Sequence, residues 1–311
     1  MAVNIQKIQH PEYGTCISME NGAAELLVTL DYGPRILHFT LSGEKNMLLV
    51  DKELALGGSG EAFDRTFYKG AHFYFRGGHR LWVSPEAYPD TSYPDNDPVD
   101  YEIGGNTVRL TCKPQVHNDV QYRFEITMDD TAPSVTILHK VTNVSNSPKT
   151  FAPWAITVMD KGGLEIVPMN TKDTGLLANR IISVWPYTNL SCTRSSFTDH
   201  YFTLRQNPEI ERAFKIGFDN EAGWSCYINH GMLFKKSYNH VVNGSYPDNG
   251  CSYETYTNNN ILELETLGEL KEFGPGETAE HIEKWELMRV DGEPDTHDDA
   301  SIAAFVKKYI G

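Results

Sequence analysis

Short runs of alternating apolar and polar residues recur along almost the whole chain, and this rhythm constrains the fold more than any other feature of the sequence. The runs are rich in Val, Ile, Thr, Tyr and Phe, and Gly, Asn, Asp and Pro separate them. A period of two indicates strands that bury one face, and closely spaced turns favour antiparallel pairing. The pattern therefore predicts an all-β fold built from large antiparallel sheets.

The alternation places most strands, and turn residues suggest how they connect. Gly104-Gly105-Asn106 and Asp129-Asp130 predict hairpins, and residues 143–148 are predicted to join two neighbouring strands. One helix is expected at the C-terminal end, where acidic residues at 298–299 precede an apolar periodic stretch and two lysines. The predicted strands are residues 25–30, 35–41, 107–113, 121–128, 134–143, 149–160, 214–218, 224–230, 232–238, 251–257, 261–266 and 278–289.

The 311 residues show no internal repeat and no linker, which predicts a single domain over 1–311. Residues 51–67 and 88–101 lack alternation and are rich in Gly, Pro, Asp and aromatic side chains. We expect both segments to be long loops, and loops often carry function. Nothing in the sequence sets the oligomeric state.

A net charge of -15 disfavours both nucleic acids and anionic membrane surfaces as partners. No apolar run approaches the roughly 20 residues that cross a bilayer, and residues 1–10 lack the apolar centre of a signal peptide. The five cysteines are odd in number and scattered. We therefore expect reduced thiols and a cytoplasmic location.

The segment from Gly77 to Glu86 concentrates chemistry beside a glycine pair. In an extended strand Arg80 and Trp82 share one face, and His79 lies on the other. An indole stacks on the C–H face of a sugar, and a guanidinium donates to hydroxyl or carboxylate groups. The segment is equally consistent with a core tryptophan beside a structural ion pair.

Glu263 and Glu265 form a second candidate pair. Alternation puts both carboxylates on one face of a strand, roughly 7 Å apart, where each can raise the pKa of the other. One of them would then suit a general base, although a solvated acidic edge gives the same pattern. Glu254, Lys235, Tyr246 and Asp248 are weaker candidates for binding a substrate. His281, Glu283 and Trp285 alternate on the last strand, and we favour a structural role for them.

Several stretches resemble the galactose-mutarotase-like superfamily, in particular a bacterial branch with a Gly-Gly-x-Arg-Leu-Trp motif. They are residues 21–36, 77–86, 256–266 and 274–278. The resemblance implies a β-supersandwich and an aldose 1-epimerase-like isomerase with Glu265 as base, acting on a small-molecule carbohydrate. The family's acid histidine is missing from the segment around Trp154, and His79 is the candidate replacement.

Two other classes of function stay open. A sugar-binding or sensing protein would keep the stacking surface of Trp82 and Arg80 without acid–base catalysis. A polysaccharide lyase or glycoside hydrolase would need a long groove. No cofactor is expected, because the sequence contains neither a phosphate-binding loop nor the common zinc and serine-hydrolase motifs. Asp90, Asp95, Asp97 and Asp100 could hold calcium, but their spacing matches no known loop, and we expect a solvated acidic segment.

Overall fold

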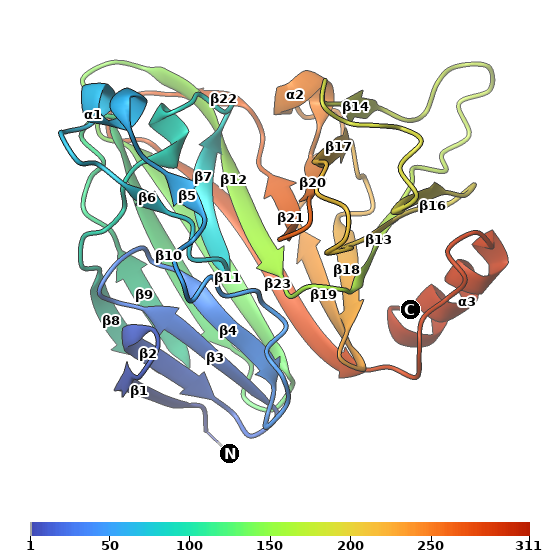
Figure 1. The fold of residues 1–311 in the computed structure, drawn as a ribbon, viewed down its shortest axis with the longest axis horizontal. Coiled ribbons are helices and arrows are strands. Elements are labelled where there is room, and N and C mark those ends of the chain that lie inside the picture. The colour runs from blue at the N-terminus through green and yellow to red at the C-terminus, as the bar shows by residue number, and fades with distance from the viewer. Residues whose placement is uncertain (1) are drawn as a thin grey trace.

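Two large antiparallel sheets pack face to face in the computed structural model, which describes residues 2–311 (Figure 1). In spatial order the first sheet contains β1 (Asn4–His10), β2 (Gly14–Glu20), β3 (Ala24–Thr29), β4 (Ile36–Leu41), β7 (His79–Ser84), β12 (Lys149–Met159), β21 (Leu262–Leu267), β20 (Tyr253–Thr257), β17 (Phe214–Phe218) and β14 (Ile182–Val184), with β22 (Lys271–Phe273) paired to β12. The second contains β15 (Ser195–Phe197), β16 (Tyr201–Arg205), β13 (Leu164–Pro168), β18 (Trp224–Asn229), β19 (Met232–Tyr238), β23 (Thr278–Arg289), β11 (Ser134–Asn143), β10 (Val120–Met128), β9 (Thr107–Thr111) and β8 (Asp100–Gly104). The predicted all-β supersandwich is confirmed.

Strong alternation located the strands well. The predictions for 134–143, 214–218, 232–238 and 278–289 coincide with β11, β17, β19 and β23. Both predicted hairpins are present, between β8 and β9 and between β10 and β11. In the second, the Asp129 carboxylate accepts from the backbone N–H groups of Thr131 (2.9 Å) and Ala132 (2.7 Å), which closes the turn.

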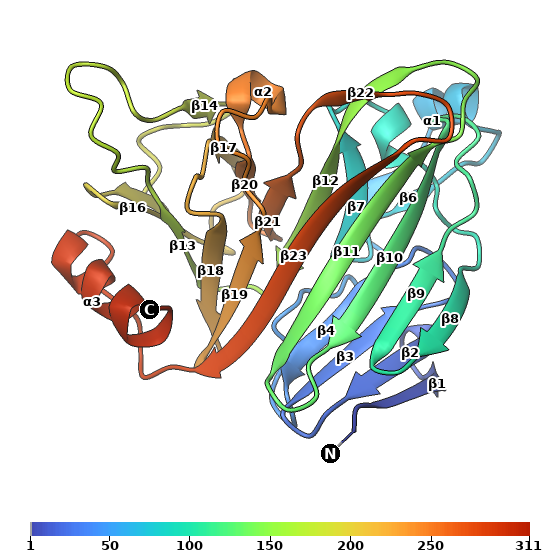
Figure 2. The ribbon, with the colours of Figure 1, turned by 180° about the vertical axis from the view of Figure 1, so that it is seen from behind.

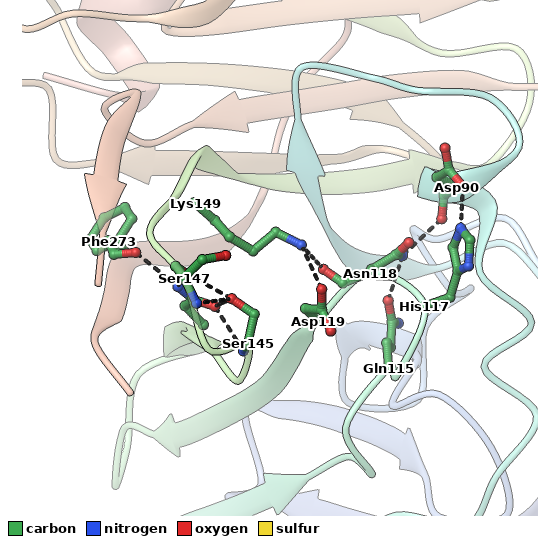
Figure 3. Close-up of polar contacts among 10 residues, drawn as sticks. Asp90, Gln115, His117, Asn118, Asp119, Ser145, Ser147, Lys149 and Phe273 are labelled. Atoms are coloured by element: carbon green, nitrogen blue, oxygen red, sulfur yellow. Dashed lines mark hydrogen bonds and ion pairs between the residues drawn. The ribbon is translucent and has the colours of Figure 1, made fainter. Parts of the chain in front are cut away.

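The prediction that residues 143–148 join neighbouring strands is wrong. β11 lies in the second sheet and β12 in the first, so the segment crosses between sheets. The buried Asn143 side chain builds this crossover, because its amide donates to the carbonyls of Ser147 and Phe273, each at 2.8 Å. Its Oδ1 atom accepts from the Ser145 N–H at 2.9 Å. The three partner residues Ser145, Ser147 and Phe273 are labelled in Figure 3. Alternation identifies a strand but not its partner.

Residues 2–311 also contain three short α-helices, α1 (Glu61–Thr66), α2 (Pro247–Gly250) and α3 (Asp299–Tyr309), and one 3₁₀ helix, η1 (Asp90–Ser92). The expected C-terminal helix is α3; its preceding Asp298 accepts from the Ala300 N–H at 3.0 Å, and its apolar side packs on the outer face of the second sheet (Figure 2). The predicted loop at 51–67 contains α1, which is too short to show a helical period, and the short strand β5 (Gly57–Gly58), which pairs with β6 (Phe73–Tyr74) beyond the loop. None of the described helices is long and apolar enough to span a bilayer.

A polar network lies inside the otherwise apolar space between the sheets. The Nε2 atoms of His79 and His139 are 2.8 Å apart, and His79 Nδ1 is 2.9 Å from the Thr157 hydroxyl. The Lys236 ammonium lies 2.8 Å from the Glu283 carboxylate, and both side chains are fully buried. The network connects β7 and β12 of the first sheet to β11, β19 and β23 of the second. The structural role predicted for Glu283 agrees with this position.

The buried histidines predict a specific pH dependence of stability. Burial lowers the pKa of His139 and of His281 from 6.5 to about 3. Between pH 6.5 and about 3, these histidines bind protons in the unfolded chain but stay neutral in the folded chain. The free energy of unfolding therefore falls as the pH drops through this window. Each histidine contributes up to about 1.4 kcal/mol per pH unit. Urea unfolding of the wild type and His139→Gln should show a shallower acid slope for the variant; equal slopes would contradict the assignment.

Candidate functional site

Strand register brings the predicted site residues onto the outer face of the first sheet. On β7, Arg80 lies opposite Ile156 of β12, which lies opposite Glu265 of β21. Glu265 in turn lies opposite Glu254 of β20. Opposite residues in adjacent strands share a face. The same register adds Trp82, Trp154, Glu263, Tyr256 and Lys215 to this face. We call these residues, together with Arg80, Glu254 and Glu265, the site floor.

Two cations hold three carboxylates on the site floor. The Lys215 ammonium lies 2.7 Å from Glu254 and 2.9 Å from Glu265. The Arg80 guanidinium donates to Glu263 at 3.0 Å. All five side chains are at least nine-tenths buried. Their charges are therefore screened little by water, and each ion pair is strong but costly to form.

Aromatic rings surround both cations. Lys215 lies 4.6 Å from the ring centre of Trp154 and 4.8 Å from that of Trp185, which follows β14. Arg80 lies 4.3 Å from the Trp82 ring. Trp82 and Trp154 contact each other edge to face, with ring centres 5.6 Å apart. Indoles beside charged groups form the kind of surface on which a sugar ring can stack while its hydroxyls reach polar atoms.

Several buried polar atoms on the floor have no partner. Trp154 Nε1 (2.8 Å) and Lys215 both reach one oxygen of Glu265, Oε2, and leave Oε1 without a hydrogen bond. Glu254 Oε1 is also without a partner, as are Nε and Nη1 of Arg80. Unpaired buried groups are costly, and binding sites are where proteins tolerate them. Within residues 2–311, these two carboxylate oxygens and two guanidinium nitrogens are buried with unused hydrogen-bonding capacity.

The floor carboxyls differ in their electrostatics. Burial raises the pKa of Glu254 well above its usual value, Lys215 opposes that shift, and the Glu265 charge adds to it. Burial also raises the pKa of Glu263, against the attraction of Arg80. Burial alone would lower the pKa of Lys215, but Glu265 and Glu254 raise it overall, so the ammonium stays charged. The floor thus holds a proton-retaining carboxyl, Glu254, directly opposite Glu265.

Glu86 and Asp248 lie at the rim of the floor. Partial burial raises the pKa of Glu86, Lys215 and Arg80 lower it, and Glu265 and Asp248 raise it. Glu86 is an exposed residue, so water screens these interactions. Asp248 accepts from the Ser84 hydroxyl at 3.4 Å. Trp185 and Asp248 also line a cavity with residues 181–184, which adjoins the floor.

The loop that carries Glu86 is tied to a neighbouring turn (Figure 3). The Asn118 amide donates to the Asp90 carbonyl at 2.8 Å, and His117 contacts the Asp90 carboxylate. Lys149, at the start of β12, donates to the Asn118 carbonyl at 2.5 Å. These contacts fix the loop that holds Glu86 at the rim.

Three predicted site residues lie elsewhere. His79 faces the interior, on the opposite side of β7 from Arg80, because successive residues of a strand alternate. Lys235 lies on the outer face of the second sheet, 3.8 Å from Glu286. Tyr246 is buried beside His240, and its hydroxyl accepts from the Val241 N–H at 2.8 Å. The structure therefore brings together Arg80, Trp82, Glu86, Asp248, Glu254, Glu263 and Glu265, and leaves the other three outside the site.

Lys215, Trp154 and Trp185 were not predicted. Lys215 lies within a predicted strand, where a single lysine among apolar residues was a usable signal of a buried charge. Trp154 stands in the segment where the resemblance leads one to expect a histidine, and its indole binds the predicted base. No pattern in the sequence pairs Trp185 with the floor, because it follows a three-residue edge strand.

Two groups of residues contain side chains of the kinds that bind metal ions. Ligand atoms of His79, His139 and Glu283 lie within 4.8 Å of one another. However, the Lys236 ammonium already occupies the place of a cation beside Glu283. In the acidic segment at 90–100, Asp97 and Asp100 are exposed, as expected of a solvated segment. Asp97 pairs with Lys113 and Asp90 with His117 at the surface, whereas Asp95 departs from the expectation because it lies in a largely buried pair with Arg35.

Comparison with solved structures identifies the fold. A galactose mutarotase-like protein from Lactobacillus casei is 10% identical, with a TM-score of 0.55, covering 88% of this chain and 100% of that one. A galactose 1-epimerase from Lactobacillus acidophilus is 15% identical, with a TM-score of 0.50, covering 93% and 99%. At these identities the likeness is one of fold, and it confirms the galactose mutarotase-like supersandwich.

A longer protein contains a similar unit. A TPR-domain containing protein from Parabacteroides distasonis is 16% identical, with a TM-score of 0.59, and the match covers 91% of this chain. This chain spans 48% of the length of that protein. No protein-family model and no curated protein matches the sequence.

Proposed function

We propose that the chain is an aldose 1-epimerase-like isomerase that interconverts the anomers of a sugar bound on the site floor. The observation that carries this proposal is the Glu254–Glu265 pair, in which one buried carboxyl retains a proton and the other is held as an acceptor. Ring opening needs a base for the anomeric hydroxyl and an acid for the ring oxygen, and such a pair supplies both.

Glu265 takes the role of the base. Its Oε2 accepts hydrogen bonds from Trp154 Nε1 and from Lys215, which fix the orientation of the carboxylate. Its Oε1 is free to accept the proton of the anomeric hydroxyl. As that proton leaves, the electron pair forms the aldehyde carbonyl, and the bond from the anomeric carbon to the ring oxygen breaks.

Glu254 replaces His79 as the acid. It lies directly opposite Glu265 in the neighbouring strand, and its Oε1 has no protein partner. Glycine at 217 leaves room for it, because a Cβ there would lie 3.2 Å from Glu254 Cγ and 2.6 Å from Cys251 Sγ. Protonation of the ring oxygen by Glu254, rotation of the aldehyde and the reverse transfers complete the cycle.

A sugar-binding protein without catalysis is the second candidate. It is favoured by one observation: the segment around Trp154, where the resemblance leads one to expect the family's acid histidine, contains no histidine. The aromatic and charged floor would bind a sugar whether or not Glu254 transfers a proton.

Exchange NMR separates these functions. Saturation transfer between the α and β anomers of a panel of free aldoses measures binding and anomer exchange in one experiment. We expect exchange above the buffer rate for at least one aldose, lost when the same aldose is displaced by a tighter ligand. Saturable binding without exchange would contradict the isomerase and leave the binding protein, and fragments released from a polysaccharide would instead indicate a lyase or hydrolase.

A further inference from the structure

The rim of the site carries negative charge without a basic partner. Neither Glu86 nor Asp248 forms an ion pair within residues 2–311. Asp248 acts on the floor, since it raises the pKa of Glu254, and the floor acts on Glu86, since Lys215 lowers the pKa of Glu86 and Glu265 raises it. Two carboxyl groups therefore stand at the edge of the floor without a cation in direct contact.

The two cations of the floor are already engaged. Lys215 is shared between two carboxylates and enclosed by two indoles, and Arg80 is bound to Glu263 with its face against Trp82. An incoming phosphate or carboxylate would have to displace one of these carboxylates from its cation. Besides Glu254, four carboxyl groups interact with this region, those of Glu86, Asp248, Glu263 and Glu265. We therefore expect anionic ligands to bind less tightly than neutral or cationic ones.

Independent observations show that this acidic surface is built to hold a ligand. Oε1 of Glu254, Oε1 of Glu265 and two nitrogens of Arg80 are buried and unpartnered on the same face. The indoles of Trp82 and Trp185 flank them, and aromatic faces attract cations as well as sugar C–H groups. Hydroxyls would satisfy the floor atoms, and a positive group would neutralise the rim.

We propose that the preferred ligand is an amino sugar whose ammonium group lies at the rim between Glu86 and Asp248, while its hydroxyls bind the floor. Only the ring opening of this amino sugar rests on the proposed function. The preference for a positively charged ligand does not depend on whether the protein catalyses a reaction. The amine would gain charge-assisted hydrogen bonds, which are about twice as strong as neutral ones.

Five probes of similar shape test the proposal by calorimetry or NMR titration near pH 7: glucosamine, glucose, N-acetylglucosamine, glucuronic acid and glucose 6-phosphate. Glucosamine should bind about tenfold more tightly than glucose. N-acetylglucosamine, which lacks the charge, should lose that advantage, and the two anionic probes should bind most weakly. Glu86→Gln and Asp248→Asn should each reduce the preference for glucosamine over glucose. Glu102→Gln, on an exposed strand of the second sheet, should leave it unchanged.

The outcomes distinguish this inference from the proposed function. Tight glucosamine binding without anomer exchange would support the inference and contradict the isomerase. Exchange of glucose, with equal affinity for glucose and glucosamine, would support the isomerase and overturn the inference. Tightest binding of glucuronic acid or glucose 6-phosphate would also overturn it, and binding of none of the five probes would overturn both.

Discussion

Replacing Glu265 with glutamine is expected to lower the rate of anomer exchange by about 10²–10⁴-fold, the contribution typical of a positioned general base. Glutamine keeps the shape of the side chain and can still accept from Trp154, but its neutral amide cannot take a proton from the anomeric hydroxyl. Lys215 keeps its 2.7 Å contact with Glu254, so its ammonium still has a carboxyl partner. Polarimetry or exchange NMR on the wild type and the variant, at matched saturation with sugar, measures the effect.

Two matched variants make this result specific to catalysis. Glu272→Gln makes the same chemical change on the exposed surface of β22 and should leave the rate unchanged. Trp154→Phe keeps an aromatic ring but removes the N–H that orients Glu265, so it should lower the rate by a smaller factor. A Glu265→Gln protein that binds sugar and exchanges its anomers at the wild-type rate would remove Glu265 from the mechanism.

The fold was accessible from the sequence where strands are long and half-buried. In β11 and β23 a buried residue alternates with a more exposed one along the strand, and the predictions were accurate there. Short edge strands such as β14 and β15 carry too few residues to show a period, and they were missed. β12 is buried on both faces over most of its length, because one face meets the second sheet and the other supports the site. Its sequence pattern therefore located the strand but not its two roles.

Only the part of the candidate site that depends on alternation within a single strand was predictable from the sequence. Alternation places Arg80 with Trp82 on one face of β7, and Glu263 with Glu265 on one face of β21, and both pairs lie on the floor. Which strands become neighbours depends on long-range pairing, which no local pattern encodes. Local patterns therefore make Lys235 a candidate for binding substrate, whereas Lys215 is the lysine that contacts the carboxylates. Alternation along β7 places His79 on the opposite face from Arg80, and in the structure His79 lies in the interior beside His139.

Because side chains alternate along a strand, the strands that carry the site on one face also contact a buried charged group, the Lys236 ammonium, on the other. Along β21, Glu263 and Glu265 lie on the floor, whereas the Leu264 carbonyl accepts from Lys236 at 3.0 Å on the interior side. Lys236 also donates to the Ala155 carbonyl at 3.0 Å and to the Thr157 hydroxyl at 2.9 Å. One buried ammonium from the second sheet therefore holds the two strands, β12 and β21, that carry Trp154 and Glu265. The interior network supports the geometry of the site.

Lys236→Met is accordingly expected to lower the free energy of unfolding by about 3–5 kcal/mol, the cost of breaking a buried ion pair by removing one partner. Methionine fills a similar volume, but it leaves the buried Glu283 carboxylate without its cation and two backbone carbonyls without a donor. Urea unfolding followed by tryptophan fluorescence and circular dichroism measures the loss. The double variant Lys236→Met/Glu283→Gln should recover part of it, because the uncompensated charge is gone while Trp285 keeps an acceptor.

Lys235→Met is the control that separates burial from strand position. Lys235 lies next in the same strand, but it points to the outer face and reaches Glu286 only at 3.8 Å with both side chains partly exposed. Pairs of this kind contribute about 0–1 kcal/mol, so the control variant should unfold near the wild-type midpoint. If the two lysine variants lost equal stability, or if adding Glu283→Gln worsened Lys236→Met, the interior pair would not be what joins β12 and β21 to the second sheet. The loss would then come from the strand as a whole, since a general weakening of β19 affects both of its faces equally.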